Sequence, residues 1–123
     1  MNSCIDWFEI PAHDIDRAQR FYEALLDVTL RRETIGGQTL AVFPSSDAGV
    51  GGCVMAGPGT PPASQAGTLV YLNAGASLDA ALARLERAGG RLVTPPVQLP
   101  GDMGRYAHVA DTEGNRVGLH ALR

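Results

Sequence analysis

The chain has 123 residues, of which 45% are hydrophobic and 19% are charged. This is the size of one domain with a core of its own, which we expect to span residues 1–123. The formal net charge of −3 argues against a nucleic acid as a partner. No apolar stretch approaches the roughly 20 residues that cross a bilayer, so we expect no membrane association.

Two residue types narrow the possible chemistry further. All ten basic residues are Arg, and without any Lys the side chains cannot form a Schiff base. Cys4 and Cys53 are too few and too far apart for a disulfide framework or a zinc ribbon, and each lies in an apolar, strand-like stretch. The first residues show neither the basic nor the apolar region of an export signal, so we expect a cytoplasmic protein.

The first half of the chain is predicted to form a strand, a helix and three more strands. Residues 4–10 are an apolar strand candidate, which Pro11 ends. Asp14 is the expected N-cap of the helix, because apolar residues follow it at helical spacing: Ile15, Ala18, Tyr22 and Leu25. Further strands are expected at residues 29–34, 38–43 and 49–56, with Gly36 and Gly37 turning the first hairpin.

The second half repeats this order after a linker. Residues 57–67 are rich in Pro, Gly and Ser, and they separate a first module of about 1–56 from a second of about 68–123. The second module is predicted to begin with a strand at 68–74 and a helix that Ser77 caps and the Gly89–Gly90 pair ends. Its remaining strands are expected at residues 91–96, 105–110 and 115–122.

The two modules resemble each other in sequence. The clearest echo is "AVFPSSDAGVGGC" (41–53) against "AHVADTEGNRVGL" (107–119), which places Gly52 on Gly118. When the helices are aligned instead, Trp7 falls on Val70. We therefore predict an α+β fold of two tandem βαβββ modules. Their strands would form a curled mixed sheet, an incomplete barrel around a groove, with the helices outside.

The stretches "WFEIPAHDIDRAQRFYEALL" and "DTEGNRVGLH" together resemble the vicinal oxygen chelate superfamily. That group includes glyoxalase I, extradiol dioxygenases and the bleomycin-resistance proteins. The most specific marks of the resemblance lie at residues 14–22, 88–90 and 111–115. We interpret the polar residues at these marks as structural: Asp111 and Asn115 as turn residues, and Arg17 as a solvated helix residue.

The resemblance implies four strand positions that face the groove, where metal-dependent members carry His and Glu ligands, two in each module. In this chain they are Trp7, Gly52, Val70 and Gly118, or Leu69 in place of Val70 because an insertion near Gly75 blurs the register. None of these side chains is a ligand for a divalent ion. We therefore expect no metal and no other cofactor, and a pocket in which Trp7 is a wall and the glycines leave space. In the alternative, the glycines only relieve crowding against Trp7.

Other residues could still carry chemistry. Because side chains two apart on a strand share a face, Glu9 is expected beside Trp7 and His120 beside Gly118, as a possible acid–base pair. In the alternative, Glu9 meets an Arg and His120 is solvated. A displaced metal site of Glu9, His108 and His120 is a less favoured third possibility.

The connection at residues 95–106 is long enough to act as a lid over the groove. Arg105, at its end, could bind an anionic group of a ligand or pair with an acidic neighbour. Asn73 could orient a polar ligand or cap its own strand.

Three functions remain open at this point. The first is a metal-independent protein whose groove binds a small organic molecule, as the bleomycin-resistance relatives do. The second is a lyase or isomerase that moves a proton next to a carbonyl, with Glu9 or His120 as base. The third is a metal-dependent lactoylglutathione lyase or dioxygenase, which the missing ligands disfavour. The resemblance also implies a homodimer, with grooves completed at or near the interface.

Overall fold

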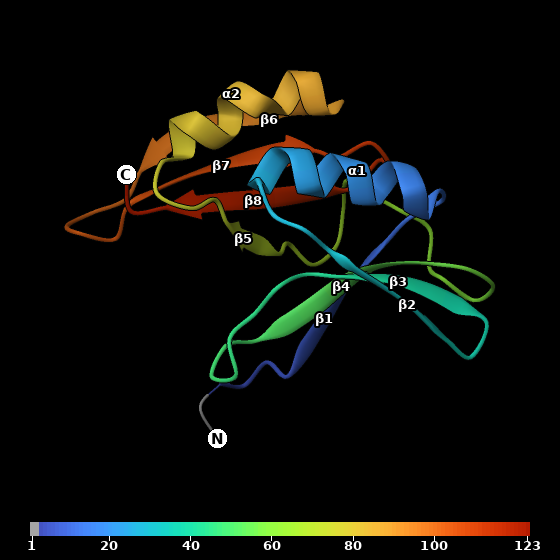
Figure 1. Ribbon diagram of the computed structural model, residues 1–123. Coiled ribbons are helices and arrows are strands. Elements are labelled where there is room, and N and C mark those ends of the chain that lie inside the picture. The colour runs from blue at the N-terminus through green and yellow to red at the C-terminus, as the bar shows by residue number, and fades with distance from the viewer. Residues whose placement is uncertain (1–2) are drawn as a thin grey trace.

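The computed structural model describes residues 3–123 and shows the predicted element order twice (Figure 1). The first module contains β1 (Trp7–Pro11), α1 (Ile15–Leu26), β2 (Arg31–Ile35), β3 (Gln38–Val42) and β4 (Gly51–Ala56). The second contains β5 (Tyr71–Asn73), α2 (Leu78–Ala88), β6 (Arg91–Gln98), β7 (Arg105–Ala110) and β8 (Arg116–Ala121). The prediction of two βαβββ modules in an α+β fold is confirmed.

Each module has its own four-stranded mixed sheet. Sheet A has the order β1-β4-β3-β2 and sheet B the order β5-β8-β7-β6. In both sheets the first strand pairs in parallel with the last, and the remaining pairs are antiparallel. The sheets do not close into a barrel.

Both helices begin where the sequence predicts, and the second also ends at the predicted glycine pair. The Asp14 carboxylate accepts a hydrogen bond from the backbone N–H of Arg17, and the Ser77 hydroxyl accepts one from that of Ala80. The second helix ends at Gly89, whose φ of 106° lies in the left-handed region that glycine adopts without strain. Asp27 ends the first helix in a similar conformation, with a φ of 55°.

One hydrophobic core joins the two modules. The helices α1 and α2 pack against each other and against one face of each sheet (Figure 1). The largest fully buried side chains of this core include Tyr22, Phe21 and Leu25 of α1, Leu78 of α2 and Leu119 of β8. The other face of each sheet, called here the outer face, is turned away from the helices. In sheet A it carries a second, smaller buried cluster of Leu40, Val42 and Cys53.

Seven of the eight strands differ from their predicted bounds by one to three residues; β5, for example, begins at Tyr71 rather than at residue 68. The first strand begins at Trp7 rather than at residue 4, and Ile5 before it is 56% exposed. Strand β6 continues through Pro95 and Pro96 to Gln98, beyond the predicted end. Proline lacks the N–H of a sheet ladder, but β6 is the edge strand of sheet B and its pairing with β7 has two register shifts. The edge position therefore tolerates both prolines.

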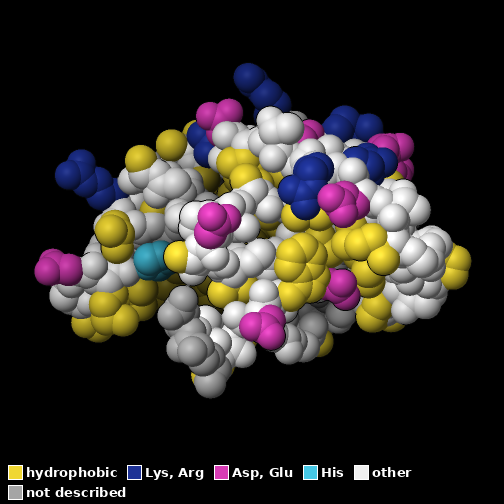
Figure 2. Space-filling model, turned by 60° about the horizontal axis from the view of Figure 1, so that its bottom comes forward, with side chains coloured by type: hydrophobic (Ala, Val, Ile, Leu, Met, Phe, Trp, Pro, Cys, Tyr) yellow, Lys and Arg dark blue, Asp and Glu magenta, His cyan; other side chains and the backbone are white. Residues whose placement is uncertain are grey.

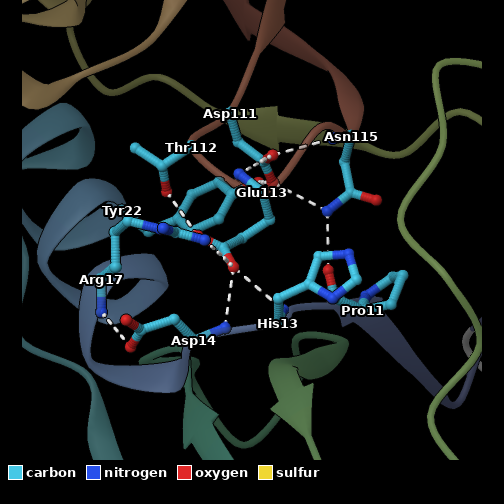
Figure 3. A network of polar contacts seen from close by, with 9 residues as sticks. All are labelled: Pro11, His13, Asp14, Arg17, Tyr22, Asp111, Thr112, Glu113 and Asn115. Carbon is cyan, nitrogen blue, oxygen red and sulfur yellow. Dashed lines mark hydrogen bonds and ion pairs between the residues drawn. The ribbon is translucent and has the colours of Figure 1, made fainter.

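The turn between β7 and β8 binds the start of α1 through buried carboxylates (Figure 3). The Asp111 carboxylate accepts hydrogen bonds from the Tyr22 hydroxyl at 2.6 Å and from the backbone N–H of Asn115 at 2.8 Å. The Asn115 amide donates in turn to the carbonyl of Pro11 at 2.7 Å. Asp111 and Asn115 are thus turn residues, as predicted, but they also connect the two modules.

The Glu113 carboxylate is the centre of this connection. It accepts hydrogen bonds from the backbone N–H groups of His13 and Asp14, both at 2.9 Å, and pairs with Arg17 Nε at 2.6 Å. The prediction that Arg17 is only solvated is therefore wrong, because its guanidinium binds a carboxylate with no exposed surface. Burial alone would raise the pKa of Glu113, but the hydrogen bonds from Arg17, Asp14, Thr112 and His13 lower the pKa to about 2.

We expect Glu113→Gln to lower the free energy of unfolding by about 1–3 kcal/mol at pH 7, since it removes a charged acceptor of several hydrogen bonds. Because the pKa of Glu113 is lowered in the folded protein, its contribution is complete above the ordinary pKa near 4.5 and is lost as the pH falls toward about 2. Urea unfolding at pH 7 and at pH 3.5 should therefore show a smaller difference between wild type and variant at the lower pH. Glu33→Gln is the control, because Glu33 pairs with Arg31 on the surface and should change stability little. An equal difference at both pH values would contradict the prediction.

Candidate ligand-binding site

The outer face of sheet B carries two rows of side chains that run across its strands. In the first row Tyr71 of β5 pairs with Gly118 of β8, Gly118 with His108 of β7, and His108 with Thr94 of β6. In the second row the same strands contribute Asn73, His120, Tyr106 and Val97. The alternate residues of these strands, such as Leu72, Ala107 and Leu119, are buried against the helices.

The first row explains Gly118. The Tyr71 ring lies across Gly118 and reaches His108, where Tyr71 Oη is 2.7 Å from His108 Nε2. A Cβ atom at Gly118 would overlap the Tyr71 ring. The glycine therefore makes room for a neighbouring aromatic ring, and the space that its missing side chain leaves is filled by Tyr71.

His108 is bound on both sides. Arg116 Nη2 lies 2.8 Å from His108 Nδ1 and 3.0 Å from the Thr94 hydroxyl. Burial lowers the pKa of His108, and the nearby positive charge of Arg116 lowers it further. The Tyr106 ring packs edge-on to Tyr71, with ring centroids 5.7 Å apart. Tyr71, Tyr106 and His108 thus form one aromatic cluster on the outer face.

Two large grooves meet at β5. The first, of about 920 Å³, runs along the second row and is lined by Tyr71, Asn73, Tyr106 and His120, with Leu99 and Leu122 beside them. The second, of about 830 Å³, lies between the modules and shares Tyr71 and Asn73; its other lining residues include Trp7, Phe8, Phe43, Leu69 and Val70. Figure 2 shows hydrophobic side chains and a histidine ring around a hollow on this side of the molecule.

His120 is held by the segment that was predicted to be a lid. Its Nε2 lies 2.6 Å from the carbonyl oxygen of Met103. A carbonyl only accepts, so the neutral His120 ring carries its proton on Nε2, and Nδ1 has a lone pair that no donor within residues 3–123 occupies. Only part of residues 95–106 is a loop, because β6 extends to Gln98 and β7 begins at Arg105.

The structure does not bring the predicted acid–base pair together within one chain. Glu9 lies on the outer face of sheet A, as its alternation with Trp7 predicts, and it accepts a hydrogen bond from Trp7 Nε1 at 3.3 Å. Glu9 lines a small groove of about 120 Å³, whereas His120 lines the first large groove. Arg105 lines neither large groove, because its guanidinium pairs with Asp79 of α2 at 3.2 Å. Of the two roles predicted for Arg105, the structure supports pairing with an acidic neighbour rather than binding of a ligand.

Backbone hydrogen bonds correct the alignment of the modules. The N–H of Ala12 donates to Met55, and the N–H of Ala74 donates to His120, each at 2.8 Å. These bonds are equivalent in the two modules, so Met55 corresponds to His120 and Ala12 corresponds to Ala74. Counting back along the strands, Cys53 then corresponds to Gly118, and Trp7 corresponds to Leu69.

Gly52 and Val70 are therefore one residue out of register with the positions that they were predicted to occupy. Gly52 lies beneath the Phe8 ring, which packs against the main core, and Val70 also packs against that core. Their neighbours Cys53 and Leu69 occupy the strand positions equivalent to Gly118 and Trp7. The alternative of Leu69 in place of Val70 is the one that the register supports.

The four residues that the corrected register places at the ligand positions fit a metal ion as poorly as the four predicted from the sequence. The side chains of Trp7, Leu69 and Gly118 have no atom that coordinates a metal ion, so the Cys53 sulfur is the single possible metal ligand of the four positions. Burial, with the nearby Glu9 carboxylate, raises the pKa of Cys53 to about 12, so the thiol stays protonated. Between residues 3 and 123, no three His, Cys, Asp or Glu side chains converge as a metal site would require. His108 is bound to Arg116 and Tyr71 and does not join Glu9 and His120.

A model of the Glyoxalase/Bleomycin resistance protein/Dioxygenase superfamily matches residues 4–119. The chain belongs to this superfamily. A solved glyoxalase/bleomycin resistance protein from Streptomyces sp. CB03234 is 25% identical with a TM-score of 0.70, and the match covers 94% of this chain and 98% of that one. TnmS3, an antibiotic binding protein from the same organism, is 24% identical with a TM-score of 0.68, over 97% and 95% of the chains.

A glyoxalase I mutant from Zea mays has the same fold, with 20% identity and a TM-score of 0.70. The match covers 95% of this chain but only 45% of the longer maize chain. A comparison with curated protein sequences gives no match. Neither helix within residues 3–123 is long and apolar enough to cross a membrane.

We expect Gly118→Ala to displace the Tyr71 ring and to lower stability by about 1–3 kcal/mol, because the added methyl overlaps that ring. Thermal unfolding measures the loss, and near-ultraviolet circular dichroism reports the moved tyrosine. In a Tyr71→Ala background the same substitution should cost much less, since the overlapping ring is gone. Equal costs in the two backgrounds would show that Gly118 is required for another reason.

Proposed function

We propose that this chain is a metal-independent, cytoplasmic binding protein for a small organic molecule, which it holds against the outer face of sheet B. The observation that carries the proposal is the aromatic cluster of Tyr71, Tyr106 and His108 beside a groove of about 920 Å³. Pockets for small molecules are commonly about 300–1,000 Å³, mainly apolar, with a few polar groups that orient the ligand. Here Asn73 and the Tyr71 hydroxyl supply such groups.

The similarity to TnmS3 supports a binding role for the same fold, since that protein is described as binding an antibiotic. The donor set supports metal independence. A divalent ion would need several oxygen, nitrogen or sulfur ligands at about 2.0–2.3 Å, and the four equivalent positions offer one protonated thiol. No step of the proposed function therefore uses a metal.

A homodimer would complete the site. Both outer faces leave large hydrophobic side chains exposed, among them Trp7 at 44% and Ile35 at 58% in sheet A, and Tyr71 at 48% in sheet B. We propose that a second copy covers these side chains, which would close the groove from a side that one chain leaves open. The molecular mass in solution tests this directly, and a strictly monomeric protein would contradict it.

A second candidate function is a lyase or isomerase that moves a proton next to a carbonyl. The observation that favours it is the lone pair on Nδ1 of His120, because this residue lines the first groove and Met103 fixes its tautomer. Glu9 is the weaker candidate base, because it lines a different groove and binds Trp7. In a dimer the base could come from either copy.

The metal content of the protein, purified without chelator, tests metal independence. We expect less than stoichiometric Ni, Zn, Mn, Fe or Mg, and no rise in melting temperature when these ions are added. A specific ion at a hundredfold excess over its Kd would stabilise the fold by about 2.7 kcal/mol, a shift that is easily seen. A stoichiometric metal with a matching stabilisation would contradict the proposal.

The variant His120→Asn separates binding from catalysis. If the protein only binds, a compound found by screening should bind the variant with a Kd within about threefold of the wild-type value, and neither protein should convert it. If His120 is a base, turnover should fall by about 10²–10⁴-fold while binding persists. Glu9→Gln is the matched control, since it also replaces a candidate base but lies at another groove. Loss of turnover in Glu9→Gln alone would move the catalytic assignment to Glu9.

A further inference from the structure

The hydrogen bonds of the first row fix where its protons lie. Arg116 is a donor only, and its Nη2 is 2.8 Å from His108 Nδ1. Nδ1 must therefore present a lone pair, and a His108 ring with a lone pair on Nδ1 is neutral and carries its proton on Nε2. Arg116 thereby selects one tautomer of His108.

That tautomer determines the role of Tyr71. His108 Nε2–H donates to Tyr71 Oη at 2.7 Å, so the phenol oxygen is the acceptor of this bond. The hydroxyl proton of Tyr71 must then point elsewhere. No side chain or carbonyl within residues 3–123 accepts it, and Tyr71 is 48% exposed and lines both large grooves. Tyr71 thus presents an unused donor to a ligand.

The charge of Arg116 favours an electron-rich partner for this donor. Arg116 forms no ion pair with a carboxylate of the described chain, and its buried Nε has no hydrogen-bond partner. Hydrogen bonds in a chain polarise one another, so the guanidinium at the far end strengthens the Tyr71 O–H as a donor. A ligand oxygen with negative charge, or a polarised carbonyl oxygen, gains most from such a donor.

We propose that Tyr71 determines ligand specificity by donating a hydrogen bond to a carbonyl or carboxylate oxygen of an aromatic ligand, and that His108 and Arg116 are positioning residues that hold Tyr71 in this role. The inference rests on the proposed binding function and names its ligand class. Tyr106, Leu99 and Leu122 provide the apolar surface for the aromatic part. Gly118 is essential to the arrangement, because the Tyr71 ring reaches His108 only across a residue without a side chain.

The proton positions can be measured without a ligand. The ¹⁵N chemical shifts of the His108 ring should report a neutral imidazole with its proton on Nε2 at pH 7. Arg116→Met should abolish the selection, so that the proton on Nδ1 becomes detectable. A charged His108 ring, or a proton on Nδ1 in the wild type, would overturn the proposal.

Three probes of similar shape test the ligand class by titration calorimetry. They are 2-naphthoate, 2-acetylnaphthalene and 2-methylnaphthalene, which carry a carboxylate, a neutral carbonyl and no acceptor. The wild type should bind the best acceptor probe at least tenfold more tightly than 2-methylnaphthalene, and Tyr71→Phe should reduce this preference to less than threefold. The order of the first two probes tells a charged acceptor from a neutral one. Tyr106→Phe is the matched control and should keep the preference, because it removes the other tyrosine hydroxyl of the groove.

The outcomes separate the two proposals. If all three probes bind equally, or if Tyr71→Phe keeps the preference, the role of Tyr71 is refuted while the binding function stands. If none of the probes binds, the proposed binding function fails for this class of aromatic compound, and the proposed role of the Tyr71 hydroxyl as hydrogen-bond donor fails with it.

Discussion

The burial of Glu113 at the junction of the modules is the interaction on which the rest of the structure depends. A carboxylate without exposed surface is costly unless charged and polar donors surround it. Here Thr112 is a donor from the same turn, and the others come from the first module: Arg17 and the backbone N–H groups that open α1. The same turn leads directly into β8, which carries Gly118 and His120. The contact that joins the modules therefore also fixes the strand on which the site is built.

Aromatic rings that lie on glycines are the second organising feature. Trp7 lies against Gly51, Phe8 against Gly52 and Tyr71 against Gly118, so each glycine of a last strand accommodates a ring from the parallel first strand. A ligating side chain at Gly118 and the Tyr71–His108 contact exclude each other, since both need the same volume. Where the resemblance predicts a metal ligand, this chain has used the space for a tyrosine instead.

The sequence was sufficient to predict the element order, the caps at Asp14 and Ser77, and the shared sheet face of Trp7 and Glu9, because these depend on local spacing. It was insufficient for the register between the modules, since an offset of one residue exchanges the two faces of a strand and no local signal reveals it. That error placed Gly52 and Val70 where Cys53 and Leu69 lie, and it hid Tyr71. The partners of Arg17 and Arg116 could not be predicted either, because each lies on another strand, helix or turn. The alternation of Tyr106 with His108 was a visible signal, but its face could be assigned only from the register with β8.

A metal ion and a polarised tyrosine are two solutions to one chemical requirement. Both would place positive potential where an oxygen of the proposed ligand binds, the ion by its own charge and the tyrosine by an O–H bond that Arg116 polarises through His108. The second solution is weaker, and it favours holding an oxygen over stabilising the full charge that develops in a reaction. It also leaves His108 neutral and already engaged at both ring nitrogens, and therefore unable to serve as a base. No donor within residues 3–123 occupies Nδ1 of His120, so His120 is the remaining histidine on this face that can accept a proton, and the proposed binding role and the alternative of proton transfer differ at this residue.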